Sequence, residues 1–467
     1  MVNRLSVETT IAQTQQRIAP DLFPLPLTPF EKFVLWDETI DHPMTSSIRL
    51  IFESKLDFDV LQDAFAFAVH CHPLLASTLT THQRQLCWNY DPQFRLKLLK
   101  SSETPILNAG RVRPFDLYSE PGIRVWCSTQ DHESWIEIQL HHACCDGVGL
   151  RRALIDVFSY YAHHTVGPAS KPSRHRIQID ALRERNDFSE VFAGEPLQKL
   201  STWQRIKNAH YFHFQLPQPL LGSRSGSVEE LPSPLDNEPA QHLRIDRESS
   251  QRILDRCRDE QLSVNNLAIA LLFRTCCVWN EQRGESHPGS RMRVLMPYAL
   301  QSRMDLRMPA ANRLSFAFLG RRRAQCADLQ ALIASLDNEL SEIRRTRLPL
   351  DFLSALQVAT RHPRLLRWGL RRSRNMSTTV LTYAGDLMRG LGKQFPKDGH
   401  SRLMGDARLV SILAAPPVRE NTNISLGLCV NWGELSLSAL WNRQVFSAQD
   451  CRDFLELYQQ NWLNWLD

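Results

Sequence analysis

A proline-rich stretch divides the sequence into two parts that each mix strand-like and helix-like segments. Residues 215–241 contain five prolines and show no helical periodicity, which is typical of a linker. In both flanking parts, segments of period-two alternation follow segments with apolar residues at helical spacing. This mixture predicts an α/β fold. At 467 residues the chain is long enough for two domains, so we expect one lobe over 1–214, a linker over 215–241 and a second lobe over 242–467.

Local signals predict the individual elements. Thr28, Pro29 and Glu31 form a capping-box pattern at the start of a helix. In the first part we expect strands over 45–52 and 135–140 and helices over 58–70 and 149–162. In the second part we expect helices over 251–260, 264–278, 327–345 and 448–465, and strands over 293–298, 314–319, 380–384, 424–432 and 434–441, the last two joined by a hairpin turn at Gly433.

Composition excludes several classes of protein. No run of about 18 apolar residues exists, and the N-terminus lacks the apolar core of a signal peptide, so we expect a cytoplasmic protein. A formal net charge of +5 is too small to indicate a nucleic-acid partner. The eleven cysteines include no Cys-x-x-Cys pair, which argues against a zinc or redox site and predicts buried free thiols.

The segment His141-His142-Ala143-Cys144-Cys145-Asp146-Gly147 lies between the strand 135–140 and the helix 149–162. A histidine at a strand end projects beyond the sheet, and its neutral imidazole can act as a general base near pH 7. Adjacent side chains on an extended segment point in opposite directions, so only one histidine can face a given cleft. Asp146 can fix the turn through backbone hydrogen bonds or through an arginine.

Taken alone, a pair of histidines at a strand end is more often structural than catalytic. A metal site would need further convergent ligands, which the neighbouring sequence does not supply. Cys144 or Cys145 as a nucleophile is a weaker interpretation than a buried apolar thiol.

The pattern His-His-x-x-x-Asp-Gly resembles the signature of the condensation-domain and CoA-dependent acyltransferase superfamily. Five further segments resemble the family's motifs in the same order, namely Pro24 to Glu31, Val69 to Leu75, Arg113 to Arg124, Ser263 to Asn266, and Met296 to Arg313. Cys71 and Ala76 replace arginines that are usual in peptide condensation domains, and the plant-type Asp-Phe-Gly-Trp-Gly motif is absent. Thr382-Tyr383-Ala384-Gly385 stands where relatives often have Ser-Asn-x-Gly. The stand-alone alcohol acetyltransferases, polyketide-associated acyltransferases and wax ester synthases are therefore the most similar members.

The resemblance implies two chloramphenicol-acetyltransferase-like lobes arranged as a V, with a tunnel between them that meets at His142. It implies that His142 deprotonates a hydroxyl or amine acceptor as that acceptor attacks an acyl thioester, and that His141 and Gly147 complete the motif. Asp146 would hold the loop through an arginine, for which Arg303 and Arg124 are the candidates. No metal or bound cofactor is implied. The thioester of acyl-CoA or of phosphopantetheine on an acyl carrier protein is a co-substrate, and we expect a monomer working in lipid or secondary metabolism.

A run of arginines over 361–374 is the strongest concentration of positive charge. We predict that Arg364, Arg367, Arg371 and Arg372 bind the phosphates of the donor. The competing interpretations are a solvated helix face, whose buried side is Leu365, Leu366, Trp368 and Leu370, and a peripheral contact with a membrane. For the protein as a whole, the alternatives to a transferase are a condensation domain that forms amides or esters, an epimerase, and a non-catalytic binding protein on the same fold.

Overall fold

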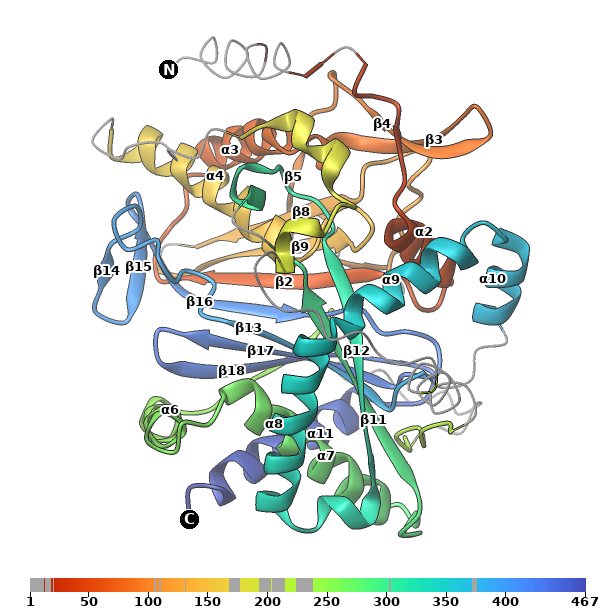
Figure 1. Cartoon of the computed structure of the whole chain (residues 1–467). Coiled ribbons are helices and arrows are strands. Elements are labelled where there is room, and N and C mark those ends of the chain that lie inside the picture. Colours follow the sequence, from red (N-terminus) through yellow and green to blue (C-terminus); the bar gives the residue numbers. More distant parts are fainter. Residues whose placement is uncertain are drawn as a thin grey trace.

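The structure is a computed structural model. It describes residues 12, 18–19, 21–104, 106–108, 111–130, 132–167, 177–192, 203, 215–223, 238–301, 304–371 and 376–467. Two large mixed sheets form the middle of the molecule, and helices cover their outer sides (Figure 1). The α/β class predicted from the sequence is confirmed. The V-shaped arrangement of two lobes stays a prediction.

The first sheet has seven strands, and its helical cover lies at the top of Figure 1. All neighbouring strands are antiparallel except β5 and β8, which are parallel. The strand order is β14 (Lys397–Asp398), β15 (Ser401–Met404), β16 (Ala407–Ala415), β2 (Thr45–Phe52), β9 (Ser134–His141), β8 (Ile123–Thr129) and β5 (Leu98–Lys100). Helices α3 (Phe58–Cys71) and α4 (Gly147–Thr165) pack against each other on this sheet.

The second sheet has six strands and lies below the first in Figure 1. Its order is β10 (Gln241–Arg244), β18 (Glu434–Trp441), β17 (Ile424–Asn431), β13 (Thr379–Gly385), β11 (Arg291–Ala299) and β12 (Leu314–Arg322). Its helices are α6 (Arg247–Asp259), α7 (Val264–Glu281), α8 (Leu329–Thr346) and α11 (Ala448–Asn464). The fully buried indoles of Trp279 on α7 and Trp462 on α11 belong to the core between these helices and the sheet.

Strands from the two parts of the chain meet in the middle of the molecule. Strand β16, from the second part, pairs with β2 in the first sheet. A Cβ atom on Gly427 of β17 would lie 1.7 Å from the carbonyl oxygen of Ala414 on β16, so only glycine permits this close approach. The linker boundary stays a prediction. Its described residues 215–223 pack on the second core, where Leu220 is buried and Leu221 N donates to Asn280 Oδ1 at 3.0 Å.

The remaining elements include a small sheet and three helices at the edge of the molecule. The small sheet has β1 (Leu25–Pro26), β4 (Gln85–Tyr90) and β3 (Ser77–His82), and β6 (Leu107–Asn108) pairs with β7 (Arg111–Val112). Helices α2 (Pro29–Asp37), α9 (Leu348–Ala359) and α10 (Pro363–Arg371) lie beside each other (Figure 1). Short 3₁₀ helices span Pro73–Ala76, Ile179–Glu184, Ser189–Phe192, Met304–Arg307 and Arg323–Cys326.

Several local predictions are confirmed. Both hydrogen bonds of the Thr28–Glu31 capping box form, and the hairpin turn places Trp432 and Gly433 at positive φ. All eleven cysteines are free and buried. In the described part of the chain, no single helix has the length and apolarity to cross a membrane. Helices α6 and α7 meet that test only as a pair bent by 113°.

The alternation of strand β9 does not separate a buried face from an exposed one. Glu137 and Gln139 are as completely buried as the apolar residues between which they lie. Arg49 on β2 compensates the charge of Glu137, since its Nε donates to Glu137 at 2.8 Å, and its Nη2 contacts Glu238 of the second part at 2.8 Å. The buried carboxylate of Glu137 is thus satisfied by an ion pair that also reaches the second part of the chain.

Candidate active site

The His-His segment lies where β9 ends and α4 begins. His141 is the last residue of β9 and pairs in register with Thr45 of β2. His141 N donates to Gly122 O at 2.8 Å, and His142 N donates to Met44 O at 2.7 Å. These backbone bonds tie the loop to the strands on both sides, so the direction of the two side chains is fixed by the sheet.

The first histidine is a structural group. His141 is completely buried, and its Nδ1 accepts a hydrogen bond from Ala143 N at 3.1 Å. The proton therefore resides on Nε2, which donates to Glu38 Oε2 at 3.1 Å. Glu38 also accepts from Met44 N at 2.9 Å. The hydrogen bond between His141 and Glu38 thus connects the His-His loop to the segment that follows α2.

The second histidine has a ring nitrogen available for chemistry. His142 is half-buried, and no residue in the described part of the chain hydrogen-bonds its Nε2. Burial within surrounding protein atoms lowers the pKa of His142, while its own backbone carbonyl and Asp146 oppose that shift. The ring is therefore neutral at pH 7. The ring hydrogen-bonds the carbonyl oxygen of the same residue, which places the proton on Nδ1. The lone pair of Nε2 is then available to act as the base.

Asn312 holds the backbone of His142 from the second part of the chain. Its Nδ2 donates to the carbonyl oxygen of His142 at 2.5 Å and lies 3.5 Å from Nδ1 of the same residue. Asn312 itself is buried. Asn312 belongs to the segment Met296 to Arg313, which resembles a motif of the family, but the sequence analysis assigned it no role. The position of this segment in the order of the motifs is the sequence feature that could have identified it.

Asp146 is the N-cap of α4 and is almost completely buried. Its carboxylate accepts from Gly149 N at 2.7 Å, from Arg313 N at 2.8 Å and from Gln301 Nε2 at 3.5 Å. Burial raises the pKa of this carboxyl group, and the two backbone N–H donors oppose the shift. Of the two roles left open for Asp146, the structure thus shows the hydrogen bonds to the backbone.

The predicted arginine partner of Asp146 needs correction. Arg124 lies elsewhere, because its guanidinium donates to Glu120 at 2.6 Å and to Arg113 O at 2.7 Å and stacks over Phe115. Arg303 lies outside the described residues. Arg152 exerts a charge effect that lowers the pKa of Asp146, and its guanidinium also hydrogen-bonds Gln301, which donates to Asp146.

Residues 300–313 are held on α4 by two further contacts. Arg152 Nη2 donates to Gln301 Oε1 at 2.7 Å, and Gln301 in turn donates to Asp146. His72 Nδ1 accepts from Ala310 N at 2.8 Å, and His72 Nε2 lies 3.1 Å from Asp156 on α4. The second part of the chain therefore contacts both motif residues, His142 through the side chain of Asn312 and Asp146 through the backbone N–H of Arg313.

The neighbouring thiols do not fit the role of a nucleophile. Cys144 and Cys145 are completely buried, and desolvation raises the pKa of both thiols. A raised pKa disfavours the reactive thiolate. Among the described residues, no group of three His, Cys, Asp or Glu side chains could hold a metal ion.

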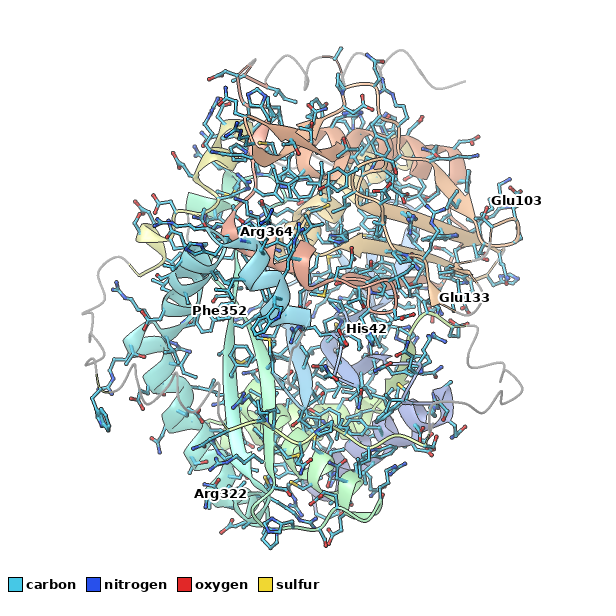
Figure 2. All side chains as sticks on the ribbon, turned by 90° about the vertical axis from the view of Figure 1, so that its right-hand side faces the viewer. His42, Glu103, Glu133, Arg322, Phe352 and Arg364 are labelled. Atoms are coloured by element: carbon cyan, nitrogen blue, oxygen red, sulfur yellow. The ribbon has the colours of Figure 1, made fainter. Side chains whose placement is uncertain are left out.

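Three of the predicted donor-binding arginines, Arg364, Arg367 and Arg371, belong to α10, and a cavity of about 290 Å³ lies beside this helix. Arg367 lines this cavity and stacks over Trp36 with its guanidinium carbon 5.0 Å from the ring centre. Glu38, the partner of His141, lines the same cavity. Arg364 is exposed, and its position is labelled in Figure 2. The side chain of Arg371 and the whole of Arg372 lie outside the described residues.

The competing interpretation of this helix is wrong in one respect. Leu366 and Leu370 are half-buried, as a packed face requires. Leu365 and Trp368, however, are exposed, because neither lies on the side of α10 that meets α2 and α9.

Solved structures of similar fold were found, whereas no protein-family model and no curated protein matches the sequence. Trichothecene 15-O-acetyltransferase TRI3 from Fusarium sporotrichioides is similar with a TM-score of 0.65 and 12% identity, over 94% of both chains. The first condensation domain of the CDA synthetase has a TM-score of 0.62 and 12% identity, over 94% of this chain and 95% of that one. Polyketide synthase associated protein 5 from Mycobacterium tuberculosis has a TM-score of 0.61 and 14% identity, over 95% and 98%.

The chain has the fold of condensation domains. The resemblance inferred from the sequence is thereby confirmed for the fold. An epimerization domain, from the third module of tyrocidine synthetase B, is also similar, with a TM-score of 0.60 and 14% identity over 94% and 96% of the chains. The similar structures thus include an acetyltransferase, a condensation domain and an epimerization domain. Because the same fold occurs with different reactions, the reaction of this protein must be inferred from the residues at its site.

Proposed function

We propose that this protein is an acyltransferase that moves an acyl group from a thioester donor to a hydroxyl or amine acceptor, with His142 as the general base. The donor is acyl-CoA or an acyl phosphopantetheine on a carrier protein. The observation that carries the proposal is the state of His142: a neutral ring with an available Nε2, on a backbone fixed by Met44 and Asn312. The V-shaped arrangement with a tunnel to His142 is part of the proposal.

The reaction balances with this single base. Nε2 of His142 accepts the proton of the acceptor hydroxyl or amine as its oxygen or nitrogen attacks the thioester carbonyl carbon. When the tetrahedral intermediate collapses, the carbon–sulfur bond breaks and the thiolate takes the proton from the imidazolium ring. The products are the ester or amide and the free thiol. Asp146 contacts no reacting atom and positions the loop through the backbone of residues 149 and 313.

A phosphate on the donor would meet Arg367 at the rim of the 290 Å³ cavity. The exposed guanidinium there is already oriented by stacking on Trp36. A planar guanidinium binds phosphate through two parallel hydrogen bonds, which suits this position at the mouth of the cavity.

The proposal is tested with a panel of acyl-CoA thioesters combined with alcohol and amine acceptors. Free thiol and acylated acceptor are measured together. We expect equal amounts of both for at least one pair. Thiol without acylated acceptor would indicate hydrolysis. No turnover, with a binding signal for the acceptor, would favour a non-catalytic binding protein. Exchange of an α-proton without acyl transfer would favour an epimerase.

The pH profile follows from the lowered pKa of His142. Because burial favours the neutral ring, the base stays deprotonated below pH 6.5 and loses activity only as the pH falls through its lowered pKa. We therefore expect the acid limb of kcat/KM, measured from about pH 4.5 to 8, to have its midpoint below 6.5. A midpoint at or above 6.5 would contradict a base in this environment.

Replacing Asn312 with alanine removes the donor that fixes the carbonyl of His142. We expect kcat to fall by about tenfold with little change in KM, because misplacing the base affects the chemical step. Asn265, whose side-chain amide donates to the Met296 sulfur at 3.6 Å, provides a matched control on the same part of the chain. Equal losses in Asn312→Ala and Asn265→Ala would mean that Asn312 has no positioning role.

A further inference from the structure

Helix α10 exposes two large apolar side chains. Leu365 is 65% and Trp368 is 54% exposed. A folded protein commonly leaves large apolar side chains in water singly, whereas two on one face of a helix fit a surface that meets an apolar partner.

The geometry of α10 places these side chains on its outer face. Successive residues of a helix are rotated by about 100°, so the half-buried Leu366 and Leu370 define the inward direction. Trp368 points in the opposite direction, with Leu365 on one side of it and Arg364 on the other. Figure 1 shows α10 at the right-hand edge of the molecule, and Figure 2 turns this edge toward the viewer.

The same segment carries only positive charge. Arg361, Arg364 and Arg367 are exposed, and the sequence from 352 to 371 contains no aspartate or glutamate. A helix that presents tryptophan and leucine beside arginines matches the interface of an anionic bilayer, where the apolar side chains enter the headgroup region and the guanidinium groups meet lipid phosphates.

We propose that the outer face of α10, with Leu365, Trp368 and Arg364, docks on an anionic membrane surface. A soluble donor or a carrier protein would also supply negative charge for the arginines. It would leave Leu365 and Trp368 in water, whereas a bilayer covers both kinds of side chain. The inference concerns an interaction surface and is independent of the chemistry proposed for His142.

Flotation with vesicles tests this surface. The full-length protein is mixed with vesicles of phosphatidylcholine alone or with roughly 30 mol% phosphatidylglycerol. We expect the wild-type protein to float with the anionic vesicles and much less with the neutral ones. Leu365→Ser/Trp368→Ala should lower the partition coefficient at least about tenfold, since two apolar side chains no longer insert. Arg364→Glu should lower it about fivefold or more and weaken its dependence on salt.

The matched control changes an exposed apolar residue and an exposed arginine on other elements. Val166→Ser/Arg252→Glu alters the end of α4 and the surface of α6, away from α10, and should leave the partition unchanged. Absence of binding to anionic vesicles, or equal loss in the control, would overturn the proposal. Unchanged vesicle binding in the α10 variants, with a raised KM for acyl-CoA, would assign the surface to the soluble donor instead. His142→Ala should still float, so a failure of the proposed chemistry leaves this test intact.

Discussion

Replacing His142 with alanine is expected to lower the rate of acyl transfer by a factor of about 10² to 10⁴ while the protein stays folded. The side chain is half-buried, and the hydrogen bonds that anchor this residue go through its backbone to Met44 and Asn312. Alanine keeps those bonds and removes only the base. We therefore expect the melting temperature to change by no more than about 2 °C.

The control for this variant is His132→Ala, which removes an exposed histidine that follows β8. Its rate and melting temperature should match those of the wild-type protein. If His142→Ala kept more than about a tenth of the wild-type rate, general-base catalysis by this residue would be wrong. A large fall in melting temperature would mean that the ring contributes to packing.

Replacing Asp146 with alanine is expected to act through stability. The substitution removes the cap of α4 and leaves the buried N–H groups of Gly149 and Arg313 without acceptors. Loss of the cap, which is the bond from Gly149 N, costs about 1 kcal/mol, and the stranded N–H of Arg313 adds about 1 to 3 kcal/mol. We therefore expect the free energy of unfolding in denaturant to fall by about 3 kcal/mol, with loss of activity as the loop shifts.

Two further variants separate the burial of this carboxylate from its capping role. Asp246 caps α6 in the same way, accepting from Ser249 N at 2.9 Å, but it is exposed. Asp246→Ala should cost only about 1 kcal/mol and leave activity unchanged. Asp146→Asn keeps one carbonyl oxygen and should lose about half as much stability as Asp146→Ala. Equal losses for Asp146→Ala and Asp246→Ala would contradict the importance of the buried contact with Arg313.

Local sequence signals predicted much of the fold. Four residues at 28–31 define a capping box that forms as expected, and strands 45–52 and 434–441 have the predicted bounds. Helix α10 begins at Pro363 and continues through Gly369. Pro363 takes the first helical position, where no N–H group is needed, and Gly369 has open space around it.

Contacts between distant parts of the chain could not be read from local patterns. The charge of the buried Glu137 is compensated by Arg49, which also contacts Glu238, and the hydrogen bonds of Asp146 come from residues 301 and 313. The sequence predicted that His142 and Asp146 lie close together, because the motif contains both residues within one strand–helix connection. It could not show that the backbone N–H groups of Gly149 and Arg313 donate to the aspartate, since a backbone group has no sequence signature.

The central claim is that Nε2 of His142 takes the proton of an acceptor during acyl transfer from a thioester. Its most direct test is a single-turnover experiment, with enzyme in excess over acyl-CoA and the acylated acceptor followed by mass spectrometry for the wild type and His142→Ala side by side. The account predicts acylated acceptor and free thiol in equal amounts for the wild type, and a first-order rate slower by a factor of about 10² to 10⁴ for the folded variant. Equal rates of acceptor acylation by both proteins would contradict it.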